Sequence, residues 1–226
     1  MRRKYMMFAL LLLLALGLAA QENTAALRFK LLEAGEYELD MFYSTELQRL
    51  YMQVDFELPK NELDPNFHYG VFLHKDAQIQ AITVSGSFEA HYWANNLQPE
   101  HFEPHLVQPE LLVWNSPARF FGIHLNNLDK YPETPHFRIW YYVQVPPFRL
   151  DETNKLTTGL DAAEFWYPRN LSRETTVQVT MTTTPYMSLR VGDTFASKLD
   201  KQFSRTHKNT YIETPSQPCG FRLVRD

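Results

Sequence analysis

Two histidines and a glutamate lie close together in the segment HFEPH, and side chains of this kind can ligate a metal ion. His101 and His105 are four residues apart, a spacing that lets two imidazoles share one metal on a helix. Pro104 disfavours a regular helix there, and no second cluster in the sequence supplies a third ligand. We therefore interpret His101, Glu103 and His105 as loop residues and expect no metal site.

Other motifs that carry catalytic chemistry are absent from the sequence. None of the eight histidines is followed by glutamate, so there is no HExxH zinc motif. The chain also lacks a G-x-S-x-G turn, a P-loop and a glycine-rich dinucleotide turn. We expect no catalytic residue and no cofactor. A hydrolase whose carboxylates converge only in the fold stays open as a hypothesis, because such a pair can be far apart in sequence.

Aromatic residues are the remaining candidates for a binding surface, since they make up 14% of the chain. Flat rings can stack on a sugar or a peptide, and the candidates for this role are Trp93, Trp140 and Trp166. The alternative is that these large rings fill the core and line strands, as their β-propensity leads one to expect.

Alternation of apolar and polar residues with period two dominates the chain and indicates half-buried antiparallel strands. The alternating runs are 37–43, 50–58, 121–125, 137–145 and 177–181, with 27–31 as either a strand or a helix. A phase slip within 77–84 predicts a β-bulge. Proline-rich connections end the strands, and no amphipathic helix of ten or more residues stands out. We predict an all-β fold, either an antiparallel β-sandwich or a folded antiparallel sheet.

The first twenty residues predict export. Residues 2–4 are basic, residues 8–18 form an apolar core, and small residues follow as a cleavage site. This is the pattern of a secretory signal peptide, and the apolar run is shorter than the ~18–20 residues of a transmembrane helix. We expect residues 1–20 to be a signal peptide and 21–226 to be a single β domain. The mature chain is then periplasmic or extracellular and has no membrane anchor.

Charge and cysteine content narrow the classes of partner. Removal of the signal peptide leaves 19 basic and 26 acidic residues, a formal charge of −7. An acidic chain with no basic run is a poor ligand for nucleic acids or anionic membranes. Cys219 is the only cysteine, so no intramolecular disulfide can form, and we interpret it as structural or incidental.

A stretch in the second half resembles a known family. A WYP segment at 166–168 precedes a strand with Thr176, Val177 and Val179, a turn with Pro185, and a strand that ends at Val191 and Gly192. This order resembles the N-terminal β domain of the gluzincin aminopeptidases, the aminopeptidase N family. Other positions that fit are Ala77, Ile79, Val84 and Gly86 in an upstream strand and loop, and Tyr211 with Pro215 or Pro218 downstream.

The resemblance covers roughly residues 45–220 and implies the fold of that β domain. The HExxH-x18-E zinc site and the G-x-M-E-N loop of the family are absent from this sequence, so the resemblance implies no catalytic residue. Pro168 biases Tyr167 toward extended geometry. We therefore expect the WYP segment to enter a strand and Trp166 to be mostly buried.

The leading hypothesis is an exported, non-enzymatic β domain that binds a protein, a peptide or a component of the cell envelope. Addition of an extended peptide to a sheet edge is one mode of such binding. The alternative from a different class is a carbohydrate-binding module that uses exposed rings such as Trp93, Trp140 or Trp166.

Overall fold

The computed structural model describes residues 28–225 apart from 105–106, 126, 174, 184–186, 193, 196, 200–206 and 214–219. The strands of this part are β1 (Phe29–Leu31), β2 (Glu36–Ser44), β3 (Arg49–Glu57), β4 (His68–His74), β5 (Gln78–Val84), β6 (Ser87–Phe88), β7 (His91–Trp93), β8 (Ala118–Ile123), β9 (His136–Gln144), β10 (Arg149–Leu150), β11 (Leu156–Leu160), β12 (Thr176–Thr183), β13 (Met187–Val191), β14 (Thr194–Phe195), β15 (Ser197–Leu199), β16 (His207–Glu213) and β17 (Phe221–Arg225). Short 3-10 helices are η1 (Lys60–Glu62), η2 (Pro99–His101), η3 (Pro109–Leu111), η4 (Leu128–Lys130) and η5 (Ala162–Glu164). None of the helices in this part is long and apolar enough to cross a membrane.

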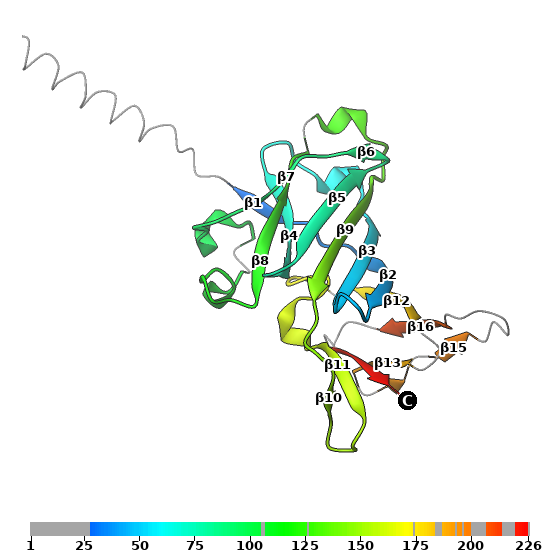
Figure 1. Cartoon of the computed structure of the whole chain (residues 1–226). Coiled ribbons are helices and arrows are strands. Elements are labelled where there is room, and N and C mark those ends of the chain that lie inside the picture. Colours follow the sequence, from blue (N-terminus) through cyan, green and yellow to red (C-terminus); the bar gives the residue numbers. More distant parts are fainter. Residues whose placement is uncertain are drawn as a thin grey trace, which may run out of the picture.

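The strands form three sheets (Figure 1). The largest has eight strands in the order β15-β16-β12-β2-β3-β9-β5-β6, the second has the order β10-β11-β17-β13-β14, and the third has the order β1-β4-β8-β7. Most neighbours are antiparallel, but β12 runs parallel to β2 and β1 runs parallel to β4. The all-β fold class is confirmed. Period-two alternation is the same in both kinds of pairing, so it did not reveal the two parallel pairs.

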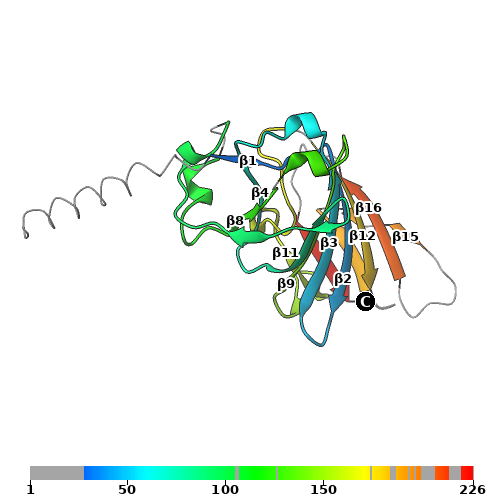
Figure 2. The same ribbon diagram turned by 90° about the horizontal axis from the view of Figure 1, so that it is seen from above.

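The two smaller sheets pack against one face of the eight-stranded sheet. Inward-facing side chains of all three sheets form one buried cluster, with Leu39 and Ile139 from the large sheet, Val71 from the four-stranded sheet, and Leu189 and Leu223 from the five-stranded sheet. Figure 2 shows β4 and β8 on one side of β2, β3 and β12. The opposite face of the large sheet carries the exposed and half-buried positions of β2, β3 and β9.

The expected irregularity in the run 77–84 is confirmed as a β-bulge. The pairing of β5 with β9 shifts between Ile79 and Ala81. The turn that follows has positive φ at Ser85 (49°) and Gly86 (84°), which is the backbone of a tight two-residue hairpin and favours glycine. The run 27–31, which the sequence left as either a strand or a helix, contains the strand Phe29–Leu31.

The proline-rich segment between β7 and β8 covers the outer face of the four-stranded sheet. Phe102 and Val107 from this segment are buried in a second cluster with Phe72 and Phe120 of the sheet, whose two rings meet edge to face at 5.6 Å. The four-stranded sheet is therefore buried on both faces. This explains why β4 shows almost no alternation, since six of its seven residues are buried.

Trp166 is fully buried, as expected. The Tyr141 hydroxyl of β9 donates to the Trp166 carbonyl oxygen at 2.7 Å, and the indole meets the Phe221 ring of β17 edge to face at 5.1 Å. Trp166 thus joins the large sheet, through its backbone carbonyl, to the five-stranded sheet, through its ring.

The expectation that WYP enters a strand is wrong, because the chain from Trp166 to Pro168 is irregular and β12 begins only at Thr176. The β1–β2 connection holds this segment instead of a neighbouring strand. Asn170 donates from its side-chain amide to the Ala34 carbonyl oxygen at 2.6 Å, and Glu33 accepts from the Ser172 backbone N–H at 3.0 Å.

Several expected features lie outside the described residues. These are the signal peptide, His105, Pro185, Pro215, Pro218 and Cys219, together with the side chain of Tyr211.

Candidate binding face of the large sheet

Three aromatic side chains form a continuous strip across the open face of the eight-stranded sheet. The register aligns Phe42 of β2 with Tyr51 of β3, and Tyr51 with Tyr142 of β9. The ring centroids are 6.2 Å apart for Phe42 and Tyr51 and 5.5 Å apart for Tyr51 and Tyr142. The Arg49 guanidinium lies 4.5 Å from the Tyr142 ring centre. Phe42 is 49% exposed, so the strip, hereafter the aromatic strip, is in contact with solvent.

Trp140 lies in the next row of the same face. It pairs with Gln53 of β3 in the register, and its indole N–H donates to the Gln53 side-chain oxygen at 2.9 Å. The Arg138 guanidinium is 5.5 Å from the indole centre. These contacts hold the half-buried ring in one orientation and leave part of it on the surface.

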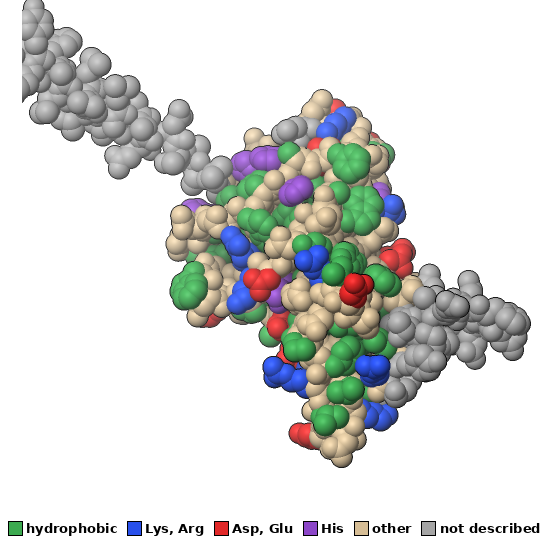
Figure 3. All heavy atoms as spheres, viewed as in Figure 1, with side chains coloured by type: hydrophobic (Ala, Val, Ile, Leu, Met, Phe, Trp, Pro, Cys, Tyr) green, Lys and Arg blue, Asp and Glu red, His purple; other side chains and the backbone are tan. Residues whose placement is uncertain are grey.

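Phe42 and Tyr51 of the aromatic strip line, together with Trp140, a shallow hollow of about 840 Å³. Its remaining polar lining comes from Asp40, Gln53, Gln80 and Thr182. At the β6 side the hollow ends at Phe88, whose side chain is 78% exposed. In Figure 3 hydrophobic side chains lie at the surface over β5 and β6.

The opposite end of the face is acidic. Glu36, Glu38 and Glu57 are exposed, and they line a smaller hollow of about 290 Å³ together with Asp55 and His136. None of the three glutamates forms a salt bridge with another described residue. This end therefore has carboxylates available for a cationic group.

Asp55 is the one carboxylate at this end with several partners. The guanidinium Nε of Arg138 donates to it at 2.5 Å, Gln53 donates at 2.6 Å, and His136 Nε2 lies 3.0 Å away. Asp55 and His136 are the kind of acid–histidine pair that a hydrolase would need. Arg138 and Gln53 hydrogen-bond to the same carboxylate, which can accept several hydrogen bonds at once, so the hydrolase hypothesis stays a prediction.

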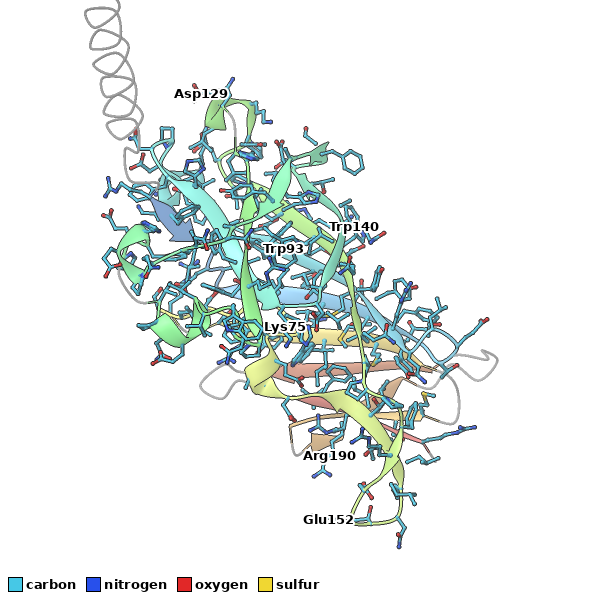
Figure 4. The ribbon with its side chains drawn as sticks, turned by 60° about the vertical axis from the view of Figure 1, so that its left-hand side comes forward. Lys75, Trp93, Asp129, Trp140, Glu152 and Arg190 are labelled. Carbon is cyan, nitrogen blue, oxygen red and sulfur yellow. The ribbon has the colours of Figure 1, made fainter. Side chains whose placement is uncertain are left out.

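The structure separates the three tryptophans that the sequence singled out. Trp140 lies on the open face, whereas Trp93 on β7 is half-buried against Phe121, at 5.4 Å between ring centres (Figure 4). Trp166 is buried, so the interpretation of its ring as a binding aromatic is wrong. Its indole fills space between two sheets, where no ligand reaches.

The aromatic strip was not predicted from the sequence as a unit. Tyr51, Trp140 and Tyr142 occupy polar positions of their alternating runs, and that was the available signal. A large ring where a polar residue is expected points to an exposed aromatic. Only the register shows that these positions are neighbours.

The residues interpreted as a loop rather than a metal site have local partners. His101 Nδ1 accepts from the Gln98 backbone N–H at 3.1 Å, and Glu103 pairs with Arg28. No group of three His, Cys, Asp or Glu side chains in the described ranges could hold a metal ion.

Two of the sequence comparisons are negative. No family model matches this sequence, and no curated protein is similar to it.

Solved structures do share its fold. The chain is similar to leukotriene A4 hydrolase from Saccharomyces cerevisiae, with a TM-score of 0.56 and 11% identity over 85% of this chain and 29% of that one. It is also similar to an M1 zinc metallopeptidase from Deinococcus radiodurans, with a TM-score of 0.52 and 13% identity over 85% of this chain and 42% of that one. The chain thus spans less than half the length of these enzymes. At such identities the likeness shows the fold, which is that of the N-terminal β domain of M1 zinc peptidases, without their catalytic zinc domain.

Proposed function

We propose that this chain is an exported, non-catalytic β domain that binds a protein or peptide ligand on the open face of its eight-stranded sheet. The observation that carries the proposal is the aromatic strip, in which Phe42 is exposed and Tyr51 and Tyr142 are half-buried on the outward face of the large sheet. Exposed apolar surface of this kind is typical of interaction sites, and tyrosine and tryptophan are enriched at the centres of interfaces.

The two ends of the face favour a ligand that has both apolar and basic side chains. The aromatic strip offers flat rings that an apolar or aromatic side chain can cover. The exposed carboxylates of Glu36, Glu38 and Glu57 attract a lysine or arginine. The formal charge of −7 expected for the mature chain adds long-range attraction for a basic partner.

The non-catalytic part of the proposal rests on the fold comparison. The matched part of the M1 peptidases lacks their catalytic zinc domain, and the described residues of this chain hold no metal-binding cluster. This likeness to a non-catalytic domain is the support for recognition in the proposal.

Binding to a peptide array by the purified mature chain tests the proposal. We expect peptides rich in aromatic and basic residues to bind, and we expect a Tyr51→Ala/Tyr142→Ala double variant to bind them at least about tenfold more weakly. Glu38→Gln should weaken binding at low salt more than at high salt, because it removes one attractive charge.

Matched controls lie on the β10–β11 hairpin, away from the face. Leu150→Ala removes an exposed apolar side chain, and Glu152→Gln removes an exposed charge at the hairpin tip (Figure 4). Both variants should bind the peptides like the unaltered chain.

Binding of a neutral glycan, in place of peptides, would favour the carbohydrate-binding alternative. Hydrolysis of a peptide or ester panel that one substitution abolishes would overturn the non-catalytic assignment. Recovery of the protein without residues 1–20 from exporting cells would support export.

A further inference from the structure

A second hollow lies beside the four-stranded sheet and shares no lining residue with the open face. It has a volume of about 460 Å³ and is bounded by the loop after β7, the turn after η3 and the start of β8. Trp114 lines it and is 96% exposed, more than any other large hydrophobic side chain that the structure describes. An indole in water to this extent is unusual, because tryptophan is highly buried on average.

The turn that carries Trp114 is firmly held. The Ser116 backbone N–H donates to the Val113 carbonyl oxygen at 3.0 Å, which closes a tight turn with Trp114 at its tip. Ser116 itself is buried, and its hydroxyl accepts from the Ala118 backbone N–H at 3.2 Å. On the other side, Leu111 and Leu112 pack against the second core cluster. The backbone at Trp114 is therefore held in place, with its side chain directed to solvent.

The polar lining of the hollow is oriented too. The Arg119 guanidinium donates to the Asn95 side-chain oxygen at 2.9 Å and lies 5.3 Å from the Trp93 ring centre. The Lys75 backbone N–H donates to the Pro117 carbonyl oxygen at 2.9 Å, which places Lys75 beside the Trp114 turn. Lys75 and Trp93 can be located in Figure 4.

The charge of the hollow differs in sign from that of the chain. Lys75 and Arg119 both line it, with Asp76 as the one carboxylate, in a mature chain whose formal charge is −7. Within the described residues neither cation forms a salt bridge. Two cationic side chains without a carboxylate partner can receive an anionic group.

We infer that this hollow binds a short saccharide that carries a carboxylate, such as an oligomer of a uronic acid. The exposed indole offers a flat ring for the apolar face of a sugar. The side-chain amides of Asn95, Asn96 and Gln98 can donate to hydroxyls and accept from them. Arg119 and Lys75 are the partners of the carboxylate, and the planar guanidinium suits its two oxygens. Apolar side chains, among them Leu97, Val113 and Phe120, complete the lining, and the amides and cations beside them match a hydroxyl-rich acidic ligand better than a purely apolar one.

Titration calorimetry with two tetrasaccharides tests the inference, one built from uronic acid and the other from the matching neutral sugar. We expect the acidic probe to bind more tightly than the neutral one. Trp114→Ala should weaken binding of the acidic probe by about tenfold or more. Lys75→Gln should reduce the preference for the acidic probe and leave the far-ultraviolet spectrum and the melting temperature unchanged.

Three controls separate this site from the rest of the molecule. Leu150→Ala and Arg149→Gln alter an exposed apolar and an exposed basic residue of β10 and should bind both probes like the unaltered chain. The Tyr51→Ala/Tyr142→Ala variant should keep the binding of the acidic probe, so failure of the open-face proposal leaves this one standing.

The inference is overturned if neither probe binds, or if Trp114→Ala binds the acidic probe as tightly as the unaltered chain. Equal affinity for both probes, unaffected by Lys75→Gln, would contradict the role of the two cations. Self-association of the chain that Trp114→Ala abolishes, without binding of either probe, would assign the exposed indole to a protein contact instead.

Discussion

Trp166 connects two sheets through its backbone and its ring. Its carbonyl oxygen accepts the Tyr141 hydroxyl of the large sheet, while its indole packs on Phe221 of the five-stranded sheet. Removal of the ring leaves a cavity at a place where both sheets are held by strand pairing and cannot collapse fully. Trp166 is therefore a structural residue, and its substitution should change the stability of the fold.

Trp166→Ala should lower the free energy of unfolding by about 3–5 kcal/mol. Urea denaturation measures this, and Trp114→Ala is the matched control, since the exposed indole at 114 should change stability by no more than about 0.5 kcal/mol. Equal losses in the two variants would contradict the placement of Trp166 in the core.

His74 is a second residue whose surroundings lead to a testable prediction, here for the pH dependence of stability. It is buried at the end of β4, where its Nδ1 accepts from the Asp76 backbone N–H at 3.1 Å. Burial lowers the pKa of this imidazole below its ordinary value of about 6.5, although the carboxylates of Asp76 and Glu164 act in the opposite direction.

The unfolded chain therefore binds a proton at His74 more readily than the folded chain does. The stability linked to this group is complete above about pH 6.5 and is lost as the pH falls toward the lower pKa of the folded state. We expect the melting temperature of His74→Gln to depend less on pH between 7.5 and 5 than that of the unaltered chain. His91→Gln, at an exposed position, is the control. Identical pH profiles for the unaltered chain and His74→Gln would disprove the assignment.

At the scale of elements, β11 and β17 approach each other so closely that one position admits only glycine. An added Cβ at Gly159 would collide with the carbonyl oxygen of Phe221 on the neighbouring strand. The Gly35 position, in contrast, has no atom within 4 Å of such a Cβ. The five-stranded sheet therefore depends on glycine at 159, and the β1–β2 connection does not depend on it at 35.

Gly159→Ala should destabilise the chain by about 1–3 kcal/mol, because the backbone must shift to relieve the contact. Gly35→Ala should be close to neutral, within about 0.5 kcal/mol. Thermal or urea unfolding of the two variants compares them directly. If Gly159→Ala left the free energy of unfolding unchanged, the backbones of β11 and β17 would have to lie farther apart at this position.

The elements that the sequence predicted well are those with one buried and one open face. The bounds of β2, β3 and β9 agree with the alternating runs 37–43, 50–58 and 137–145 to within one residue at each end. The agreement is this close because each of these strands alternates between core and solvent. β4 gave no such pattern, since the covering loops bury its outer face as well. The WYP segment misled for a different reason. Its proline restricts the backbone, but the residues directly after it, Asn170 and Ser172, are held by Ala34 and Glu33, which are remote in sequence.

At the scale of the whole molecule, the two smaller sheets cover the same face of the large sheet. The covered face forms the main core, and the opposite face presents the aromatic strip and the acidic end to solvent. The proposed saccharide hollow lies over the four-stranded sheet, on the loops that cover it. The two proposed ligand surfaces thus lie on separate parts of the molecule and differ in charge.

The sequence by itself determined the fold class, the bulge in β5 and the family of folds to which the chain is similar. These follow from local properties, namely the two-residue period of a strand, the restraint at proline and short motifs. Only the tertiary structure decided which aromatics share a surface, because the register of β2, β3 and β9 places Phe42, Tyr51 and Tyr142 side by side. Alternation assigns a ring to one side of its own strand, but its neighbours come from strands far along the chain, and their alignment depends on packing of the whole sheet.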